Sequence, residues 1–187
     1  MHVQGARPDS TGRVPDTGRR TVLLTGGSGV VGRALLQRLG DFDVVCLVHN
    51  TPVAGPNVTA VPGDIAKPMF GLGERAYAAL TARVDAVIHC AAITDFNRSD
   101  GSLEATNIAG TEHVAAFAAA ANAVLYHVST AFVDTTADGD RGHTAIGYAS
   151  SKSAAEQVVR SRGGPRDAGQ KLLGRVVRLV PLGVVKG

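Results

Sequence analysis

Tyr148 and Lys152 form the pair in this sequence whose types and spacing are best suited to chemistry. They stand four residues apart in the segment YASSK, which we place at the start of a helix over residues 148–162. This spacing puts both side chains on one helix face, where an ammonium can lower the pKa of a phenol from its usual value near 10. Tyr148 would then donate a proton at neutral pH. Taken alone, a Tyr and a Lys at this spacing could equally lie on an exposed helix surface, because the spacing often occurs by chance.

A second polar group, Ser129 and Thr130, ends the apolar run LYHVST. The run predicts a buried strand over residues 124–129, and open α/β sheets bind their ligands at the carboxyl ends of the strands. Thr130 can therefore hydrogen-bond the carbonyl oxygen of a bound substrate.

Three glycines, Gly26, Gly29 and Gly32, stand three residues apart between an apolar run and an amphipathic segment. They suit a tight turn at Gly26, close approach of the backbone to a pyrophosphate at Gly29, and close packing of helix on strand at Gly32. The first-turn amides of the helix would point at the phosphates, where the helix dipole favours an anion. The turn predicts a dinucleotide site, and the alternative is a flexible turn. Ser28, Val30 and Val31 complete the predicted cofactor-binding segment.

The preference between NAD and NADP is predicted from the end of the second strand. That strand, DVVCLVHN, ends in His49 and Asn50, without the acidic residue that usually binds the ribose hydroxyls of NAD. This leaves room for a 2′-phosphate, with His49 and Arg33 within reach, so the sequence favours NADP(H) over NAD(H). The alternative for His49 is an exposed residue at a strand end with no contact.

These residues need elements to position them, and short Val-, Leu- and Ile-rich runs alternate with helical patterns along the chain. The alternation predicts an α/β fold of the Rossmann type, a doubly wound parallel sheet of about six strands with helices on both faces. The predicted strands cover residues 21–25, 43–48, 58–61, 86–91, 124–129 and 175–180, and the helical patterns cover 32–39, 73–84, 103–121 and 148–162.

Composition indicates a soluble cytoplasmic domain. The 187 residues are 44% hydrophobic and 19% charged, with no secretory signal and no apolar run long enough to span a membrane. We expect residues 1–20 to form a disordered basic tail and residues 21–187 to form one domain. The net charge of +3 comes from scattered arginines, which argues against nucleic acid. Cys46 and Cys90 are expected to be buried thiols in strands, with no metal site.

The segments TGGSGVVG, GDI, HCAA, NIAGT, VST and YASSK, in this order, resemble the extended short-chain dehydrogenase/reductase superfamily over about residues 21–180. The resemblance implies that Asp64 and Ile65 flank an adenine and that Asn107 supports a proton relay. It also implies that Ala91, Ala92 and Ile93 line the cofactor, that Thr130, Tyr148 and Lys152 form the catalytic group, and that Tyr148 and Lys152 contact the cofactor as well.

The middle of the chain, VPGDIAKPMFGLGERAYAALTARVDAVIHCAAITDF, is similar to the thioester reductase branch, which includes terminal reductase domains of peptide synthetases and fatty acyl-CoA reductases. The similarity implies reduction by NADPH of an acyl thioester, on a carrier protein or on coenzyme A, to an aldehyde or alcohol. The alternatives are a nucleotide-sugar epimerase or dehydratase, against which the segment KPMFGL argues, and a non-catalytic dinucleotide sensor, against which YASSK argues.

The end of the sequence carries one more expectation. Reductases of this branch build the substrate pocket from segments after the sixth strand, and here seven residues follow Val180. We expect a cofactor-binding half that is truncated, or that oligomerises or takes its substrate lobe from a partner, with very low reductase activity of its own.

Overall fold

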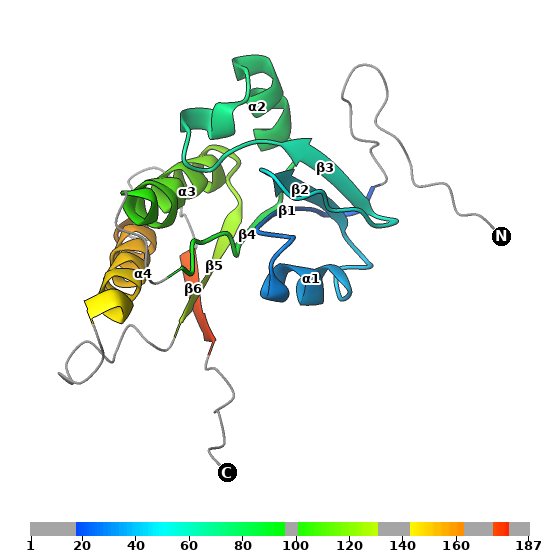
Figure 1. Cartoon of the computed structure of the whole chain (residues 1–187). Coiled ribbons are helices and arrows are strands. Elements are labelled where there is room, and N and C mark those ends of the chain that lie inside the picture. Colours follow the sequence, from blue (N-terminus) through cyan, green and yellow to red (C-terminus); the bar gives the residue numbers. More distant parts are fainter. Residues whose placement is uncertain (1–17, 96–100, 131–142, 163–173, 180–187) are drawn as a thin grey trace, which may run out of the picture.

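A six-stranded parallel sheet organises the chain (Figure 1). The computed structural model describes residues 18–95, 101–130, 143–162 and 174–179. The strands are β1 (Thr21–Thr25), β2 (Asp43–Val48), β3 (Val58–Pro62), β4 (Ala86–His89), β5 (Val124–Thr130) and β6 (Gly174–Leu179), in the spatial order β3-β2-β1-β4-β5-β6. This order confirms the predicted doubly wound fold, and its direction reverses between β1 and β4, where such sheets bind ligands.

Helices cover both faces of the sheet. Figure 1 shows α1 on one side and α3 and α4 on the other. The helices are α1 (Val30–Leu36), α2 (Glu74–Thr81), α3 (Gly110–Ala120) and α4 (His143–Arg162), with a short 3₁₀ turn over Pro68–Gly71 and a π-helical turn over Glu104–Ala109 that leads directly into α3.

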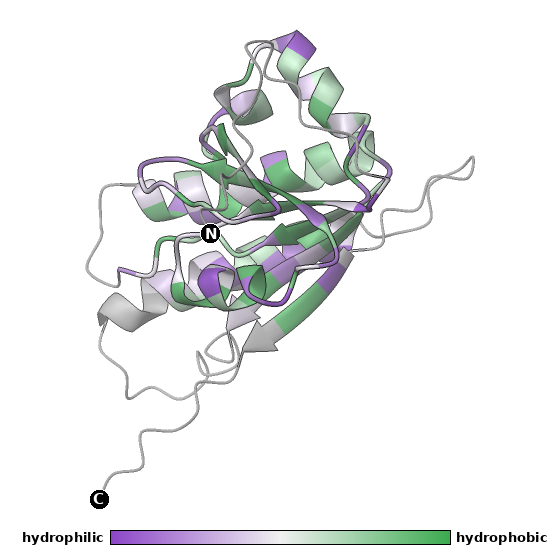
Figure 2. Cartoon of the chain, turned by 90° about the vertical axis from the view of Figure 1, so that its right-hand side faces the viewer, coloured by the Kyte–Doolittle hydropathy of each residue, from purple (hydrophilic) through white to green (hydrophobic). Residues whose placement is uncertain are grey.

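The two faces of the central strands belong to two apolar clusters. Leu23, Val45, Val87 and Leu125 pack with Val114, Phe117 and Val159 of α3 and α4 on one face. Leu24, Val44 and Cys46 pack with Leu35, Leu36 and Leu39, in and just after α1, on the other. Figure 2 shows the strands largely coloured as hydrophobic. Burial on both faces is why these strands are continuous apolar runs rather than alternating ones.

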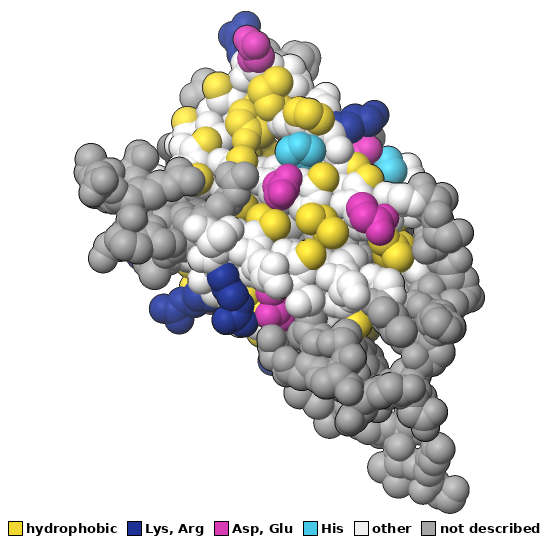
Figure 3. Space-filling view, turned by 90° about the vertical axis from the view of Figure 1, so that its left-hand side faces the viewer, with side chains coloured by type: hydrophobic (Ala, Val, Ile, Leu, Met, Phe, Trp, Pro, Cys, Tyr) yellow, Lys and Arg dark blue, Asp and Glu magenta, His cyan; other side chains and the backbone are white. Residues whose placement is uncertain are grey.

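The outer face over α3 and α4 is mixed in character. In Figure 3, hydrophobic side chains lie among acidic and histidine side chains, and the Lys and Arg side chains stand at separate places rather than in one patch. In the described part of the chain, no helix is long and apolar enough to cross a membrane.

Strand β4 ends earlier than predicted, at His89 rather than at residue 91. The backbone amide of Cys90 still donates to the Thr25 carbonyl at 3.1 Å, but the amide of Ala91 donates to the Thr25 hydroxyl instead, at 3.3 Å. The Ala91 amide is thus bonded to a side chain rather than to the backbone of a neighbouring strand, and the chain leaves the sheet. Cys90, predicted inside a buried strand, lies after the strand and is only partly buried, whereas Cys46 is buried in β2.

Helix α4 begins at His143, five residues before the predicted start, so Tyr148 and Lys152 lie inside the helix rather than at its start. The added residues include a glycine and two β-branched residues, and their low helix propensity did not indicate this earlier start. Strand β6 begins at Gly174, and its predicted last residue, Val180, lies outside the described residues, as do residues 1–17 of the predicted tail and the segment after β6.

Candidate active site

The glycine turn joins β1 to α1 by close backbone contacts. Gly26 has a φ of +72°, and a Cβ there would lie 2.5 Å from the amide nitrogen of Ala91. A Cβ on Gly32 would overlap the Gly26 carbonyl oxygen and lie 2.7 Å from Cα of Gly27. Glycine is therefore required at the first position for the turn and at the third for packing of α1 on the strand.

Gly29 lies on the wall of a cavity of about 640 Å³ at the carboxyl ends of β1 to β4. Of the residues predicted to bind the cofactor, the cavity brings together Gly26, Ser28, Gly29, His49, Asp64, Ile65, Ala91, Ala92 and Ile93. It also takes in residues that sequence reasoning missed, among them Asn50, Thr51, Cys90, Ser102, Ala105 and Thr106. The last three come from the helical segment before α3, and no spacing in the sequence pointed to them.

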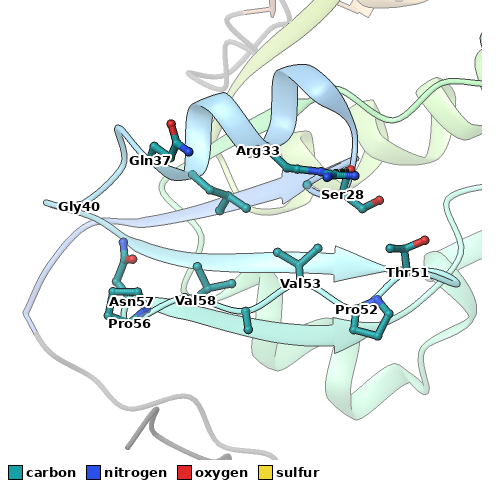
Figure 4. Close-up of a pocket in the computed structure, with 14 residues that line it drawn as sticks. Ser28, Arg33, Gln37, Gly40, Thr51, Pro52, Val53, Pro56, Asn57 and Val58 are labelled. Atoms are coloured by element: carbon teal, nitrogen blue, oxygen red, sulfur yellow. Dashed lines mark hydrogen bonds between the residues drawn. The ribbon is translucent and has the colours of Figure 1, made fainter. Parts of the chain in front are cut away.

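Other residues predicted to bind the cofactor lie outside this cavity wall. In the first turn of α1, Val30 is 89% exposed and Val31 is partly buried, and Gly32 is buried against the turn. Arg33 lines a neighbouring cavity of about 660 Å³ between α1 and the β2–β3 connection. Figure 4 shows Arg33 and Ser28 at the same end of this groove as Thr51. The Nε of Arg33 donates to the Ser28 carbonyl at 2.6 Å, which holds the guanidinium on the glycine turn.

Ser28 and Thr51 line both cavities, so the two spaces meet beside the glycine turn. His49 lies in the first cavity wall, with its Nε2 3.9 Å from Oδ2 of Asp64. No acidic residue ends β2, as the sequence shows. The segment after the neighbouring strand β3, however, brings Asp64 beside His49. Parallel strands end at one edge of the sheet, so an acid from β3 can lie beside a residue from β2.

The segment that carries Asp64 and Ile65 is braced from several directions. The Asp64 side chain accepts from the amide of Ala66 at 2.9 Å, and the Asp64 amide donates to the Phe70 carbonyl at 2.9 Å. Nδ1 of His113, on α3, donates to the Ile65 carbonyl at 2.8 Å. These contacts fix the wall where the resemblance places an adenine.

The predicted catalytic residues lie at the end of β5 and on α4, and all are buried. Thr130 and Tyr148 are each 8% exposed and Lys152 is 3% exposed. None of the three lines the cavity described above. The Lys152 ammonium donates to the Val128 carbonyl at 2.9 Å and lies 3.5 Å from Nε2 of His127. The lysine is thus held against β5.

The prediction that Lys152 lowers the pKa of Tyr148 is wrong for the free protein. Burial raises the pKa of the Tyr148 phenol above 10, because the charged form loses its hydration. Burial also lowers the pKa of Lys152 to about 8, although Cys90 and Glu156 oppose the change. Tyr148 therefore keeps its proton at neutral pH.

Asn107 links the cavity wall to α4 through its side chain. Its Oδ1 accepts from the Ile93 amide at 2.8 Å, and its Nδ2 donates to the Ile93 carbonyl at 3.1 Å and to the Ser151 hydroxyl at 3.0 Å. Ser151 donates in turn to the Tyr148 carbonyl at 2.8 Å. The amide thus braces two parts of the site, a use that the resemblance did not imply.

Two buried histidines, His89 and His127, were missed by sequence reasoning. Both are 1% exposed, and their ring centres lie 5.1 Å apart. Burial lowers the pKa of His127 to about 3, and its Nδ1 has no hydrogen-bond partner among the described residues. The sequence does contain an indication of both histidines, because each is a polar residue at an inward-facing position of an apolar strand. The described residues contain no group of three side chains suited to a metal ion.

The sheet order, the glycine turn at the first βα junction and the Tyr–Lys pair on the helix after β5 define a dinucleotide-binding domain of the extended short-chain dehydrogenase/reductase class. The chain belongs to the family described as "Male sterility protein", whose model matches residues 49–178.

Similar proteins agree with this assignment. The chain is 32% identical to an isonitrile lipopeptide synthase of Streptomyces coeruleorubidus, over 83% of this chain and 12% of that protein. It superposes on the terminal R domain of the myxalamid PKS-NRPS pathway with a TM-score of 0.72 and 28% identity, covering 89% of this chain and 50% of that one. The reductase domain of a non-ribosomal peptide synthetase from Mycobacterium tuberculosis gives a TM-score of 0.62 and 25% identity, over 86% and 46% of the two chains.

These likenesses confirm the resemblance to the thioester reductase branch that the motifs indicate. The chain spans half or less of the length of each of these three relatives.

Proposed function

We propose that this chain carries the cofactor site and the proton-donating residues of a reductase that acts on acyl thioesters. The substrate class is an acyl group held on a carrier protein or on coenzyme A, and the cofactor is NADP(H). The observation that carries the proposal is the cavity at the switch point of the sheet, whose wall combines the glycine turn with Asp64 and Ala91–Ile93.

The residues present fit a dinucleotide. Gly29 lies on the cavity wall, and a Cβ there would enter the turn to within 3.3 Å of the Gly26 carbonyl oxygen. Ser28 and Gly29 would hold the pyrophosphate, and Asp64 and Ile65 the adenine. When bound, NADPH supplies the hydride that reduces the acyl carbon, which yields an aldehyde, a free thiol and NADP⁺.

The chain's own residues then serve the carbonyl oxygen. The Tyr148 phenol, protonated in the free protein, donates a proton as negative charge develops there, and the Thr130 hydroxyl donates a hydrogen bond. Lys152 supplies a positive charge near the same strand end and a contact to the ribose. Asn107 holds the cavity wall and α4 together, which supports the geometry that the transfer needs.

The substrate class rests on the relatives. The isonitrile lipopeptide synthase and the R domains are parts of assembly-line synthetases by their names, and such synthetases present acyl groups as thioesters. No observation favours the epimerase alternative over this one.

The preference for NADP(H) is supported by the junction of the two cavities. Arg33 is held there by Ser28, and Thr51 lines both spaces. A 2′-phosphate at this junction would meet a guanidinium, which binds phosphate strongly. Asp64 lies beside His49, on the adenine side of the turn. Its carboxylate would repel a 2′-phosphate placed against it.

Titration of the purified chain with NADPH and NADH by fluorescence tests the cofactor proposal. We expect tighter binding of NADPH, and Arg33→Ala should remove most of the difference while leaving NADH affinity unchanged. Equal affinities in the unaltered protein would contradict the preference.

Consumption of NADPH with acyl-CoA and acyl-carrier substrates, with and without a separately supplied C-terminal lobe of an R domain, tests the activity. Tyr148→Phe is the inactive control.

A further inference from the structure

A continuous run of hydrogen bonds crosses the interior from β1 toward α4, and His89 stands in its middle. The Thr25 hydroxyl lies 2.7 Å from Nδ1 of His89, and Nε2 of His89 lies 3.0 Å from the Thr111 hydroxyl. Thr111 donates to the Asn107 carbonyl at 2.7 Å. All four residues are 1% exposed, so water does not compete for these bonds.

A single arrangement of protons satisfies every member of this run. The Thr111 hydroxyl has one hydrogen, which it gives to Asn107, so it accepts from His89 and the ring proton sits on Nε2. Nδ1 of His89 is then an acceptor, and Thr25 donates to it. The arrangement needs a neutral ring, and burial, with smaller effects of His127 and Lys152, lowers the pKa of His89 well below 6.5.

Both ends of the run reach the proposed active site. At the first end, Thr25 Oγ1 accepts from the amide of Ala91, a residue of the cavity wall. At the other end, Asn107 is bonded to Ile93 of the same wall and to Ser151, which contacts the backbone of Tyr148. One buried network therefore joins the strand before the glycine turn, the wall after β4 and the helix with the catalytic pair.

We propose that His89 and Thr111 are positioning residues, which hold the cofactor wall at Ala91–Ile93 in a fixed relation to the helix that carries Tyr148 and Lys152. Neither residue lines the cavity, so neither touches a bound dinucleotide there. Any effect of changing them on cofactor affinity must be transmitted through Asn107 or Thr25. The choice of NADPH as ligand rests on the proposed function.

Thr111→Val and Thr111→Ser form the matched pair that tests the proposal. Valine keeps the shape and removes the hydroxyl, whereas serine keeps the hydroxyl. We expect Thr111→Val to weaken NADPH binding roughly three- to tenfold, the range of a transmitted coupling, and Thr111→Ser to stay near the unaltered affinity. Binding by Thr111→Val that equals binding by the unaltered protein would overturn the proposal.

Val114→Ala separates positioning from general loss of stability. Val114 lies on the same helix as Thr111, is fully buried, and belongs to the apolar core rather than to the hydrogen-bond run. This variant lowers the melting temperature by creating a cavity, and we expect it to leave NADPH affinity unchanged well below its melting temperature. If Val114→Ala weakens binding as much as Thr111→Val, the effect is one of stability and the positioning role is refuted.

Two measurements test the run without any ligand. The protein has six histidines, so ¹⁵N spectra of the ring nitrogens can show whether the proton of His89 is on Nε2, as required, or on Nδ1, which would overturn the run. Amide exchange of Ile93 should speed up in Thr111→Val and not in Thr111→Ser. A protein that binds no dinucleotide but passes both measurements would refute the proposed function and leave the network standing.

Discussion

Lys152 is a charged residue in an environment very different from water. It is 3% exposed, and two of its three N–H donors point to Val128 and His127. Because burial lowers its pKa to about 8, the charge of this lysine changes near pH 8. We expect the third donor to bond a ligand, and the strength of that bond depends on the charge of the lysine.

Cofactor affinity should therefore decrease above pH 8. The ammonium is present below its pKa and is lost above it, so a ribose hydroxyl bound to it loses a charge-assisted hydrogen bond. We expect NADPH to bind roughly tenfold more weakly at pH 9.5 than at pH 7. Lys152→Met, which keeps the volume without the charge, should bind weakly at both pH values. A pH dependence that persists in this variant would assign the titration to another group.

Tyr148 should be needed for turnover and not for binding. Tyr148→Phe keeps the ring and its packing and removes the transferable proton, so we expect a loss of ~10²–10⁴ in rate with a nearly unchanged dissociation constant for NADPH. Activity is measured in the presence of whatever substrate lobe restores turnover to the unaltered chain. Equal turnover of the phenylalanine variant would remove Tyr148 from the mechanism.

For single residues, the sequence predicted which residues form the candidate site better than it predicted their contacts. The glycine spacing predicted Gly26 and Gly32 correctly, because a turn and a close packing each exclude a side chain. The predicted direction of the Tyr148 pKa was wrong, because spacing on one helix does not show which other elements bury the phenol. His89 escaped notice for the same reason, since its partners come from three other elements.

At the scale of the elements, the turn over Pro68–Gly71 has an unusual backbone. Met69 and Phe70 have φ values of 52° and 60°, and Gly71 follows with 69°. Left-handed residues other than glycine are unfavourable, and the turn is held by Phe70, which is fully buried with its ring centre 5.3 Å from that of Phe117. The same turn places the Phe70 carbonyl on the Asp64 amide, so it supports the cofactor wall.

Met69 allows this backbone to be tested without touching the core, because its side chain is 39% exposed. Met69→Gly removes the left-handed penalty and should stabilise the protein by about 1 kcal/mol. Met69→Val, β-branched, should destabilise it by a similar amount or more. Urea unfolding of both variants measures the effect. Equal unfolding midpoints for the two would mean that the turn is not left-handed at this position.

The strands were predictable as elements, because runs buried on both faces are continuous in the sequence, as in TVLLT of β1 and DVVCLV of β2. Their ends were less so. Strand β4 stops where the Thr25 hydroxyl replaces a backbone partner, and the turn at Met69 cannot be foreseen from residues that rarely adopt its conformation. Both differences depend on contacts between distant segments, which periodicity does not contain.

For the molecule as a whole, the two buried histidines tie stability to pH. His89 and His127 have pKa values well below the 6.5 of an exposed histidine, His127 at about 3. In the unfolded chain both bind protons below pH 6.5, whereas in the folded protein they stay neutral. The unfolded state then holds more protons, so the free energy of unfolding decreases as the pH falls through 6.5 and continues to fall until the folded pKa values are reached.

Between pH 7 and pH 5 each such histidine should cost roughly 2 kcal/mol of stability, which urea unfolding at both pH values would measure. His127→Gln, which has no group that titrates here, should remove about half of this loss. His49→Gln is the matched control, because the His49 side chain is 64% exposed. If both variants lose stability with falling pH as steeply as the unaltered protein, His127 is not neutral and buried in solution, and the pairing of its Nε2 with the Lys152 ammonium fails with it, since that contact requires a neutral ring.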